Sequence, residues 1–187
     1  MSDELEPWRV EGSRTVLRDP WIHLRADRCI TQRGAVLDPF YVLEYRDWAH
    51  VVAFDEDDHL LLVRQWRHGA AAFSLELPGG VMEPGEDPLQ AGARELLEET
   101  GHAAPALTHV AALSPNAANF TNRVHVMLGV GARKVKDLSL DPGEDVVVER
   151  VPWRNAAAMA LSGEMIHSQH VGLLMMALAR AKGLRFG

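Results

Sequence analysis

The sequence contains a single cysteine, Cys29, so it cannot form an intrachain disulfide bond. Cys29 lies in an apparent strand, and we expect it to be a small packed residue rather than a nucleophile. Long apolar runs are also missing, and the longest, 171–179, is far too short to span a membrane. The acidic N-terminal residues lack the apolar segment of a signal peptide. These absences predict a soluble cytoplasmic protein with no membrane partner.

Positive charge is in the minority, with 19 Lys and Arg against 26 Asp and Glu and a formal net charge of −7. A nucleic-acid partner held by a basic surface is therefore not expected. An anionic small-molecule substrate remains compatible, because local arginines and a metal ion can reverse the sign of the potential inside a cleft. The 187 residues suffice for one domain with a core and a small additional unit.

Residues 1–46 have the pattern of a separate antiparallel unit of two or three strands. Broken alternation runs through 16–26 and 27–31, a hairpin turn is expected at 32–34, and 40–45 has the pattern of a returning strand. Such a small sheet buries too little surface to be stable alone. We expect it to pack on the remaining domain, 47–187, or on a second subunit.

Residues 47–187 have the pattern of an α/β (mixed α+β) domain. A helix is expected to begin at Asp87 as N-cap, with Pro88 in its first position, and to end at Gly101. The other expected elements are strands at 51–54, 60–66, 74–77, 107–113, 123–130 and 144–151 and helices at 155–162 and 165–182. The order β-β-β-α-β-β-β-α predicts a mixed sheet with helices on its faces.

Three glutamates of the first helix, Glu95, Glu98 and Glu99, are spaced i,i+3 and i,i+4. They share one helix face, with Cβ atoms roughly 5–6 Å apart. Like charges this close repel and favour protonation unless a cation lies among them. A hard cation such as Mg²⁺ prefers carboxylate oxygens, waters and substrate phosphates. With the preceding turn, Gly79-Gly80, the stretch predicts a loop–helix metal site for a phosphorylated substrate.

The whole stretch fits the pattern Gly-x5-Glu-x7-Arg-Glu-U-x-Glu-Glu-x-Gly-U, where U is a bulky aliphatic residue. The matching positions are Gly80, Glu86, Arg94, Glu95, Leu96, Glu98, Glu99 and Gly101. This pattern, named the box and spanning 80–102, resembles the signature of the Nudix hydrolases. His102 departs from it, since the family usually has an aliphatic or aromatic residue there, but no ligand is lost. The resemblance implies a Nudix-type α/β/α sandwich preceded here by the small N-terminal sheet.

The resemblance also implies how the metal is held. Glu95 and Glu99 are the expected main ligands of Mg²⁺, or alternatively Mn²⁺, with Glu98 nearby and the carbonyl of Gly79 completing the shell. Water bound to such an ion has a lowered pKa and becomes a usable nucleophile.

Three residues are implied as catalytic: Glu98, Arg94 and Glu144. Arg94 is expected to lie over the helix and orient Glu86 or another carboxylate. A carboxylate from a late loop is expected to deprotonate the water, and Glu144 is the candidate, with Asp145 and Glu149 as alternates.

The whole chain resembles the group of ADP-ribose pyrophosphatases and nucleoside-diphosphate-sugar hydrolases. An N-terminal antiparallel unit precedes the domain, 63–67 resembles the group's Gln-aromatic-Arg strand end, and Pro115 matches a proline in the loop after the box. In members specific for ADP-ribose, a glycine usually follows this proline, whereas Asn116 follows Pro115 here. Other nucleotide sugars therefore remain possible substrates. The resemblance implies a homodimer in which the N-terminal unit is exchanged or packed across the two-fold axis.

Five residues are candidates for substrate binding. Arg67 is the expected diphosphate contact, because a guanidinium binds phosphate in a bidentate manner. The others are Arg64, Glu76, Pro115 and Trp48, and Trp48 or Trp8 could stack on a purine.

Two alternatives to a nucleotide-sugar hydrolase stay open. One is a Nudix pyrophosphatase acting on dinucleoside polyphosphates or other nucleotides, and the other is a catalytically silent Nudix ligand-binding module. His167 and His170 have the i,i+3 spacing of metal ligands, but no third ligand is evident, so both are expected on the surface.

Overall fold

The computed structural model describes residues 4–141 and 143–183, which form two compact units. The first consists of residues 4–46 with Ser114–Arg123, and the second of Asp47–Leu113 with 124–183. No helix in these ranges is long and apolar enough to cross a bilayer.

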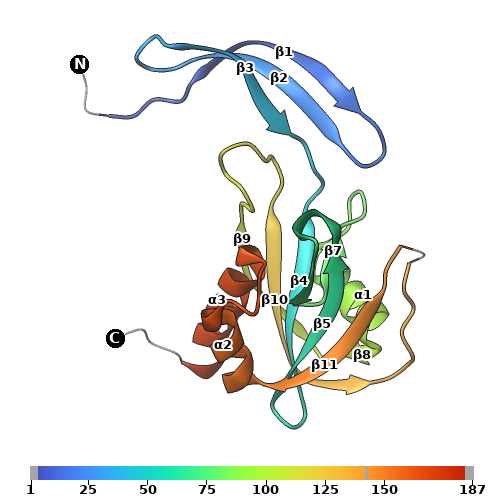
Figure 1. Ribbon diagram of the computed structural model, residues 1–187. Helices are drawn as coiled ribbons and strands as arrows, with labels where there is room; N and C mark the ends of the chain where they lie inside the picture. Colours follow the sequence, from blue (N-terminus) through green and yellow to red (C-terminus); the bar gives the residue numbers. More distant parts are fainter. Residues whose placement is uncertain (1–3, 142, 184–187) are drawn as a thin grey trace. The chain divides into compact units, whose positions relative to one another are not determined.

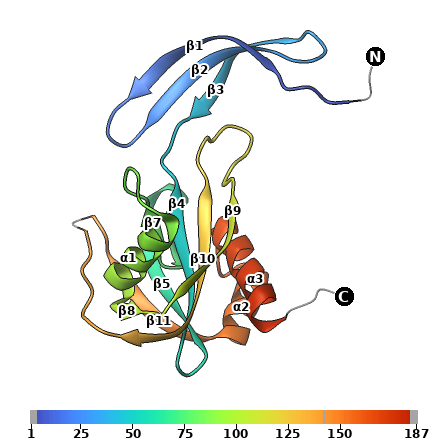
Figure 2. The same cartoon turned by 180° about the vertical axis from the view of Figure 1, so that it is seen from behind.

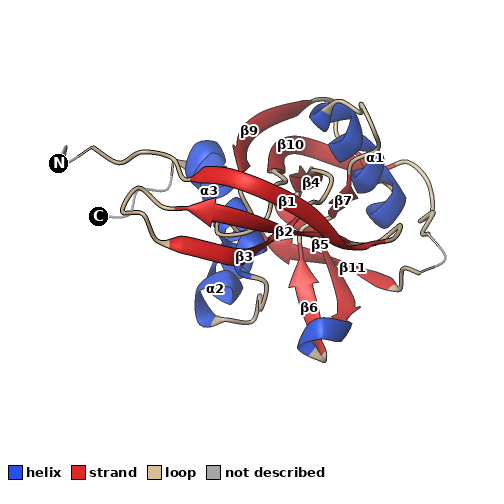
Figure 3. Ribbon diagram, turned by 90° about the horizontal axis from the view of Figure 1, so that it is seen from above, coloured by secondary structure: helices blue, strands red, loops and turns tan. Residues whose placement is uncertain are grey.

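The described part of the first unit contains one antiparallel sheet with the strand order β1-β2-β3 (Figure 3). The strands are β1 (Arg9–Arg18), β2 (His23–Ile30) and β3 (Val36–Leu43). Cys29 is buried on β2, so its predicted role as a packed residue is confirmed.

The turn between β1 and β2 lies within the stretch 16–26, where the alternation is broken. Asp19 makes this turn, because its Oδ1 accepts hydrogen bonds from the backbone N–H groups of Trp21 (2.7 Å) and Ile22 (2.8 Å). A side-chain oxygen that binds the backbone two or three residues later is a strong turn signal.

The loop Ser114–Arg123 belongs with the first unit, although the sequence places it inside 47–187. The N–H of Leu43 donates to the carbonyl of Asn119 (2.8 Å), and the N–H of Thr121 donates to the carbonyl of Leu43 (3.1 Å). The rings of Tyr45 and Phe120 pack edge to face at 5.2 Å. The loop therefore extends the first unit beyond β3.

The second unit is built on a mixed sheet whose order, within the described residues, is β11-β5-β4-β10-β8. Strand β6 pairs with β5, β7 with β4 and β9 with β10, and only the β4–β10 pair is parallel among these. The strands are β4 (Trp48–Asp55), β5 (His59–Arg67), β6 (Ala72–Glu76), β7 (Gly79–Val81), β8 (His102–Ala103), β9 (Leu107–Leu113), β10 (Val124–Lys134) and β11 (Val146–Pro152).

Helices cover both faces of this sheet (Figures 1 and 2). Helix α1 (Pro88–Thr100) packs on the face lined by Ala49, Val51 and Met127. Helices α2 (Trp153–Ser162) and α3 (Ser168–Lys182) pack on the face lined by Val52, Phe54, Leu62 and Val126. Successive residues of β4 thus serve opposite cores, as strand geometry requires. The predicted α/β/α sandwich with a mixed sheet, preceded by an antiparallel sheet, is confirmed.

The ends of α1 also follow the sequence prediction. Asp87 is the N-cap, and its Oδ1 accepts a hydrogen bond from the N–H of Leu89 (2.9 Å). Pro88 occupies the first helical position, and Gly101 ends the helix in the left-handed conformation with φ of 70°. The last helix starts at Ser168, three residues later than the pattern indicated. A short 3-10 helix, η1 (His68–Ala70), follows β5.

Candidate active site

The three glutamates of α1 lie beside β7. Glu95 and Glu99 are buried, with exposed fractions of 6% and 3%, while Glu98 is half-buried. The backbone N–H of Gly79 donates to Oε2 of Glu99 (2.7 Å), which fixes that carboxylate against the strand. The predicted loop–helix arrangement therefore brings the glycine turn and the acidic face together.

Both glycines of β7 are needed for this close approach. A Cβ on Gly79, whose φ is +149°, would lie 2.2 Å from the carbonyl oxygen of Ala49. A Cβ on Gly80 would lie 2.8 Å from Oε1 of Glu95. Gly79 therefore lets β7 lie close to β4, and Gly80 leaves the space that the Glu95 carboxylate fills; the two residues together are named the Gly79–Gly80 cradle.

The buried carboxylates are poorly solvated. Burial raises the pKa of Glu95 to about 7, against the opposing charge of Arg94, and Glu98 and Glu144 raise it further. Burial likewise raises the pKa of Glu99 to about 8, with the hydrogen bond from Gly79 opposing and the charges of Glu95 and Glu144 adding to it. A hard divalent cation would supply the missing positive charge, and these oxygen donors suit one.

Arg94 lies among the acids of the box. Its Nε donates to Oε1 of Glu86 (2.9 Å), and its Nη1 donates to Oε1 of Glu95 (2.8 Å) and Oε2 of Glu98 (3.1 Å). The expected contact with Glu86 is therefore present, and it lowers the pKa of that carboxyl. Arg94 holds Glu86, Glu95 and Glu98 in one arrangement.

The late-loop acids differ in their surroundings. Glu144 is half-buried, and its Oε2 accepts a hydrogen bond from the N–H of Asp141 (3.1 Å). Glu149 is bound instead by Arg64, with Nε–Oε1 of 2.5 Å and Nη2–Oε2 of 3.2 Å. Asp145 is exposed. Arg64 is occupied by Glu149, and the choice of a base among Glu144, Asp145 and Glu149 stays a prediction.

Arg67 lies at the end of β5 and forms a two-point ion pair with Glu76. Glu76 has no exposed surface, and His170 also lies 3.1 Å from its Oε2. Both carboxylate oxygens of Glu76 are thus bound by protein donors, and its contact with the substrate stays a prediction. His170 is only 1% exposed, so its expected surface position is wrong. The i,i+3 histidine spacing could not show that α3 turns His170 toward the sheet.

The remaining candidate residues fall in different parts of the fold. Trp48 begins β4 and packs partly against the core beneath α2 and α3. Trp8 is in the first unit, where its ring meets Phe40 edge to face at 5.6 Å. Pro115 is half-buried in the loop that belongs to the first unit. Their roles in substrate binding stay predictions.

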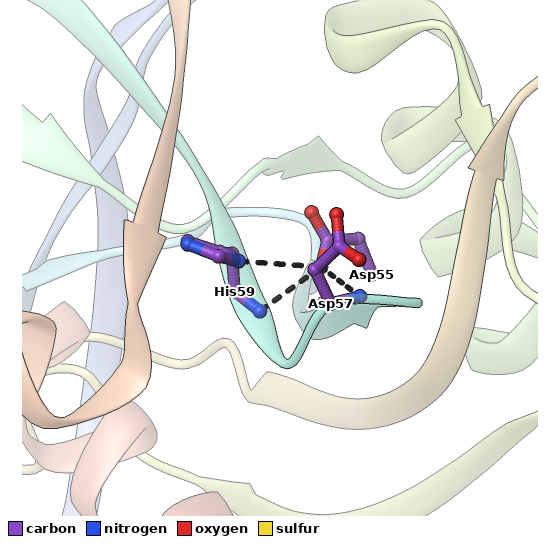
Figure 4. A group of neighbouring side chains, drawn as sticks. All are labelled: Asp55, Asp57 and His59. Carbon is purple, nitrogen blue, oxygen red and sulfur yellow. Dashed lines mark hydrogen bonds and ion pairs between the residues drawn. The ribbon is translucent and has the colours of Figure 1, made fainter.

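Another acidic group, which the sequence did not single out, occurs at the turn from β4 to β5 (Figure 4). One atom from each of Asp55, Asp57 and His59 lies within 4.8 Å of the others. Oδ1 of Asp55 accepts hydrogen bonds from the N–H groups of Asp57 and His59, both at 2.9 Å. Arg150 pairs with both aspartates. These contacts account for the group as a hydrogen-bonded turn whose two carboxylates share one arginine.

Family models match nearly the whole of this architecture. The model described as “NUDIX domain” matches residues 44–170, and the chain therefore belongs to the Nudix family. The model described as “Nucleoside diphosphate sugar hydrolase N-terminal domain” matches residues 8–43. The family resemblance drawn from the glutamate-rich box is confirmed.

Named relatives are similar to this chain over part of their length. The “ADP compounds hydrolase NudE” of Escherichia coli is 32% identical over 105 residues, 56% of this chain and 55% of the relative. The “ADP-ribose pyrophosphatase” of Bacillus subtilis is 31% identical over 116 residues, 62% of this chain and 63% of the relative. The protein of that name from Mycobacterium tuberculosis is 31% identical over 147 residues, 78% and 70% of the two chains. The chain thus spans less than two thirds of the first two relatives.

A solved structure has the same fold. The “Crystal structure of ADP compounds hydrolase” superposes with a TM-score of 0.85 and covers 97% of this chain and 98% of its own. Its sequence identity of 23% makes this a likeness of fold alone.

Proposed function

We propose that this chain hydrolyses the diphosphate bond of a nucleoside diphosphate sugar, such as ADP-ribose or another nucleotide sugar, with Mg²⁺ or Mn²⁺ as its ion. The products are a nucleoside monophosphate and a sugar phosphate. The observation that carries the proposal is the burial of Glu95 and Glu99 against the Gly79–Gly80 cradle. The names of the relatives and the match at 8–43 support the substrate class.

Glu95, Glu98 and Glu99, with the carbonyl of Gly79, would hold the ion. When bound, the ion supplies positive charge against the phosphate oxygens and lowers the pKa of a coordinated water. Arg94 keeps the box acids in register through its three carboxylate contacts. The protein thus contributes to catalysis mainly through fixed charges around the diphosphate.

Arg67 and Glu144 complete the proposed chemistry. Arg67 offers N–H groups to the diphosphate, and Glu144 accepts the proton of the attacking water. The hydroxyl bonds to one phosphorus, the bond from that phosphorus to the bridging oxygen breaks, and the bridging oxygen leaves with the other phosphate. The proton on Glu144 then returns to solvent.

The test is phosphate release, after a coupling phosphatase, from ADP-ribose, ADP-, GDP- and UDP-sugars, diadenosine polyphosphates and nucleoside triphosphates, with and without Mg²⁺ or Mn²⁺. We expect release that needs the ion and is concentrated on nucleotide sugars. Release from diadenosine polyphosphates or triphosphates alone would overturn the substrate class. No release from any compound would favour a silent ligand-binding module.

Glu99→Gln tests the metal site within the same assay. The amide keeps the size of the side chain but removes its charge, so we expect hydrolysis to fall about 100-fold or more while the fold survives. Glu56→Gln, which neutralises an exposed glutamate outside the box, is the matched control and should keep the wild-type rate. A wild-type rate in Glu99→Gln would contradict the proposed ligand.

We also propose that the chain forms a homodimer through its first unit. Every residue of β1 is exposed. Large apolar side chains at the surface of this unit include Trp8, Val10, Val16, Leu17, Trp21, Val36 and Tyr41. A second copy would cover this apolar surface. Light scattering should give twice the chain mass, and a monomer at all concentrations would contradict the proposal.

A further inference from the structure

A buried row of polar side chains leads from α3 to Arg67. His170 in the first turns of α3 is the inner end of this row, and Glu76 at the end of β6 is its centre. Neither has more than 1% of its surface exposed. Polar groups this deeply buried are expected to have full sets of hydrogen bonds, so their partners define what the row does.

The hydrogen bonds of His170 fix its tautomer. The backbone N–H of Leu77 donates to Nδ1 of His170 (3.0 Å), so this nitrogen is the acceptor. The hydrogen therefore lies on Nε2, which is 3.1 Å from Oε2 of Glu76 and donates to it. One imidazole thus connects the backbone just before the Gly79–Gly80 cradle with the carboxylate that holds Arg67.

Other rings restrict the imidazole of His170 to this orientation. His50 and His167 meet it edge to face, with ring centroids 4.6 Å and 4.7 Å away. Burial holds the pKa of His50 well below its ordinary value, so His50 packs as a neutral ring. Nε2 of His50 lies 3.1 Å from the side-chain nitrogen of Gln169. The Nε2–H group of His170 is therefore held in its direction toward Glu76.

Glu76 connects the fixed imidazole of His170 to the guanidinium of Arg67. Burial alone would raise the pKa of Glu76, but the hydrogen bonds from Arg67 and His170 outweigh it and hold the pKa well below its ordinary value. The carboxylate binds Nε of Arg67 at 2.8 Å and Nη2 at 2.5 Å. With Oε2 shared between His170 and Nη2, the carboxylate plane is set by both partners.

The Nη1 side of the Arg67 guanidinium is available to bind a ligand. Within the described residues, no hydrogen bond is made by Nη1, and the side chain is 41% exposed. The hydrogen bond with Glu76 raises the pKa of Arg67, and the charges of Glu99 and Glu144 raise it further. A planar donor fixed on one edge and open on the other suits a phosphate oxygen.

We propose that His170 is a positioning residue for the substrate diphosphate, acting through Glu76 on the guanidinium of Arg67. This inference rests on the proposed function of Arg67 as the diphosphate contact. His170 touches no reacting atom, and its effect belongs in substrate binding rather than in bond cleavage.

Two substitutions separate the two hydrogen bonds of His170. In His170→Asn the amide oxygen takes the place of Nδ1, so the bond from Leu77 is kept and the donor to Glu76 is lost. In His170→Gln the amide nitrogen reaches the place of Nε2, so the donor to Glu76 is kept. We expect His170→Asn to raise KM for the nucleotide sugar about tenfold with little change in kcat, because a hydrogen bond to a charged group is lost. His170→Gln should rescue KM to within about twofold of wild type.

A second readout needs no turnover. The Nε–H of Arg67, held by Glu76, should give a slowly exchanging nitrogen-bound proton resonance, assigned by its loss in Arg67→Lys. We expect this resonance to disappear in His170→Asn and to persist in wild type and His170→Gln. If wild type hydrolyses none of the tested compounds, the proposed function fails, while this readout still tests the coupling of His170 to Arg67.

Two outcomes would overturn the inference. One is a wild-type KM and an unchanged Arg67 resonance in His170→Asn. The other is an equal loss in both His170 variants that follows an equal fall in melting temperature, since a structural role alone predicts no rescue by Gln.

Discussion

At the scale of single residues, Gly80 leaves the space that the carboxylate of Glu95 fills. A Cβ on Gly80 would lie 2.8 Å from Oε1 of Glu95. A side chain at this position would therefore displace the carboxylate from its place beside β7. The requirement is steric, since Gly80 does not have a positive φ.

Gly80→Ala tests this steric requirement. We expect the Glu95 carboxylate to be displaced and hydrolysis of the nucleotide sugar to fall about 100-fold, because small misplacements of reacting groups are costly. Gly172→Ala on α3 is the control, since its Cβ would meet open space. That change should leave the rate intact and stabilise the helix by about 0.5–1 kcal/mol. Equal rates in the two variants would show that the cradle is not needed.

Glu76 gives a pH-dependent prediction. Its pKa is lowered on folding by Arg67 and His170, from about 4.3 in the unfolded chain. The carboxylate therefore contributes stability above pH about 4.3, and this contribution is lost as pH falls through the folded pKa.

Glu76→Gln should therefore destabilise the protein at pH 7 by about 3 kcal/mol. The amide offers one oxygen in place of the two carboxylate oxygens that bind Arg67 and His170, and it removes the negative charge. Urea unfolding at pH 7, 5 and 3 should show the difference from wild type narrowing at the lowest pH. In the control Glu56→Gln, which removes an exposed ion pair with Arg133, the loss should stay below about 1 kcal/mol. A constant difference at all three pH values would exclude the linkage.

At the scale of elements, α1 is specified by local chemistry. The N-cap bond from Leu89 to Asp87, the proline in the first position and the left-handed Gly101 all depend on neighbours in sequence. These features were predictable because each signal acts within one helical turn. The turn between β1 and β2 is specified locally as well, because Asp19 and Pro20 are turn residues and Asp19 binds the backbone two and three residues later.

Asp87→Ala should lower the free energy of unfolding by about 1 kcal/mol, since the N–H of Leu89 loses its acceptor. Asp87→Asn keeps a side-chain oxygen and should stay close to wild type. Urea denaturation measures both. Equal losses in the two variants would attribute the effect to the charge at the helix start rather than to the hydrogen bond.

At the scale of the whole molecule, the first unit is completed by a distant segment. Leu43 forms backbone hydrogen bonds with Asn119 and Thr121, and Asn122 donates a side-chain hydrogen bond to the carbonyl of Arg46 (3.1 Å). Removing residues 1–46 would leave the loop 114–123 without these partners.

We therefore expect the chain lacking residues 1–46 to melt about 5 °C or more below the full chain. Calorimetry measures the change, and Arg33→Ser at the exposed β2–β3 turn, outside the apolar surface of the unit, is a control that should leave the melting temperature unchanged. An unchanged melting temperature and unchanged mass in the shortened chain would refute a stabilising role for the first unit.

The sequence by itself determined the acidic face of α1, its caps and the family, because spacing along a helix fixes which side chains share a face. Only the tertiary structure decided that His170 is buried and that Glu76 binds Arg67 and His170 rather than solvent. Leu77 and His170 are 93 residues apart. Contacts over such distances depend on how β6, β7 and α3 pack, and no local pattern encodes that packing.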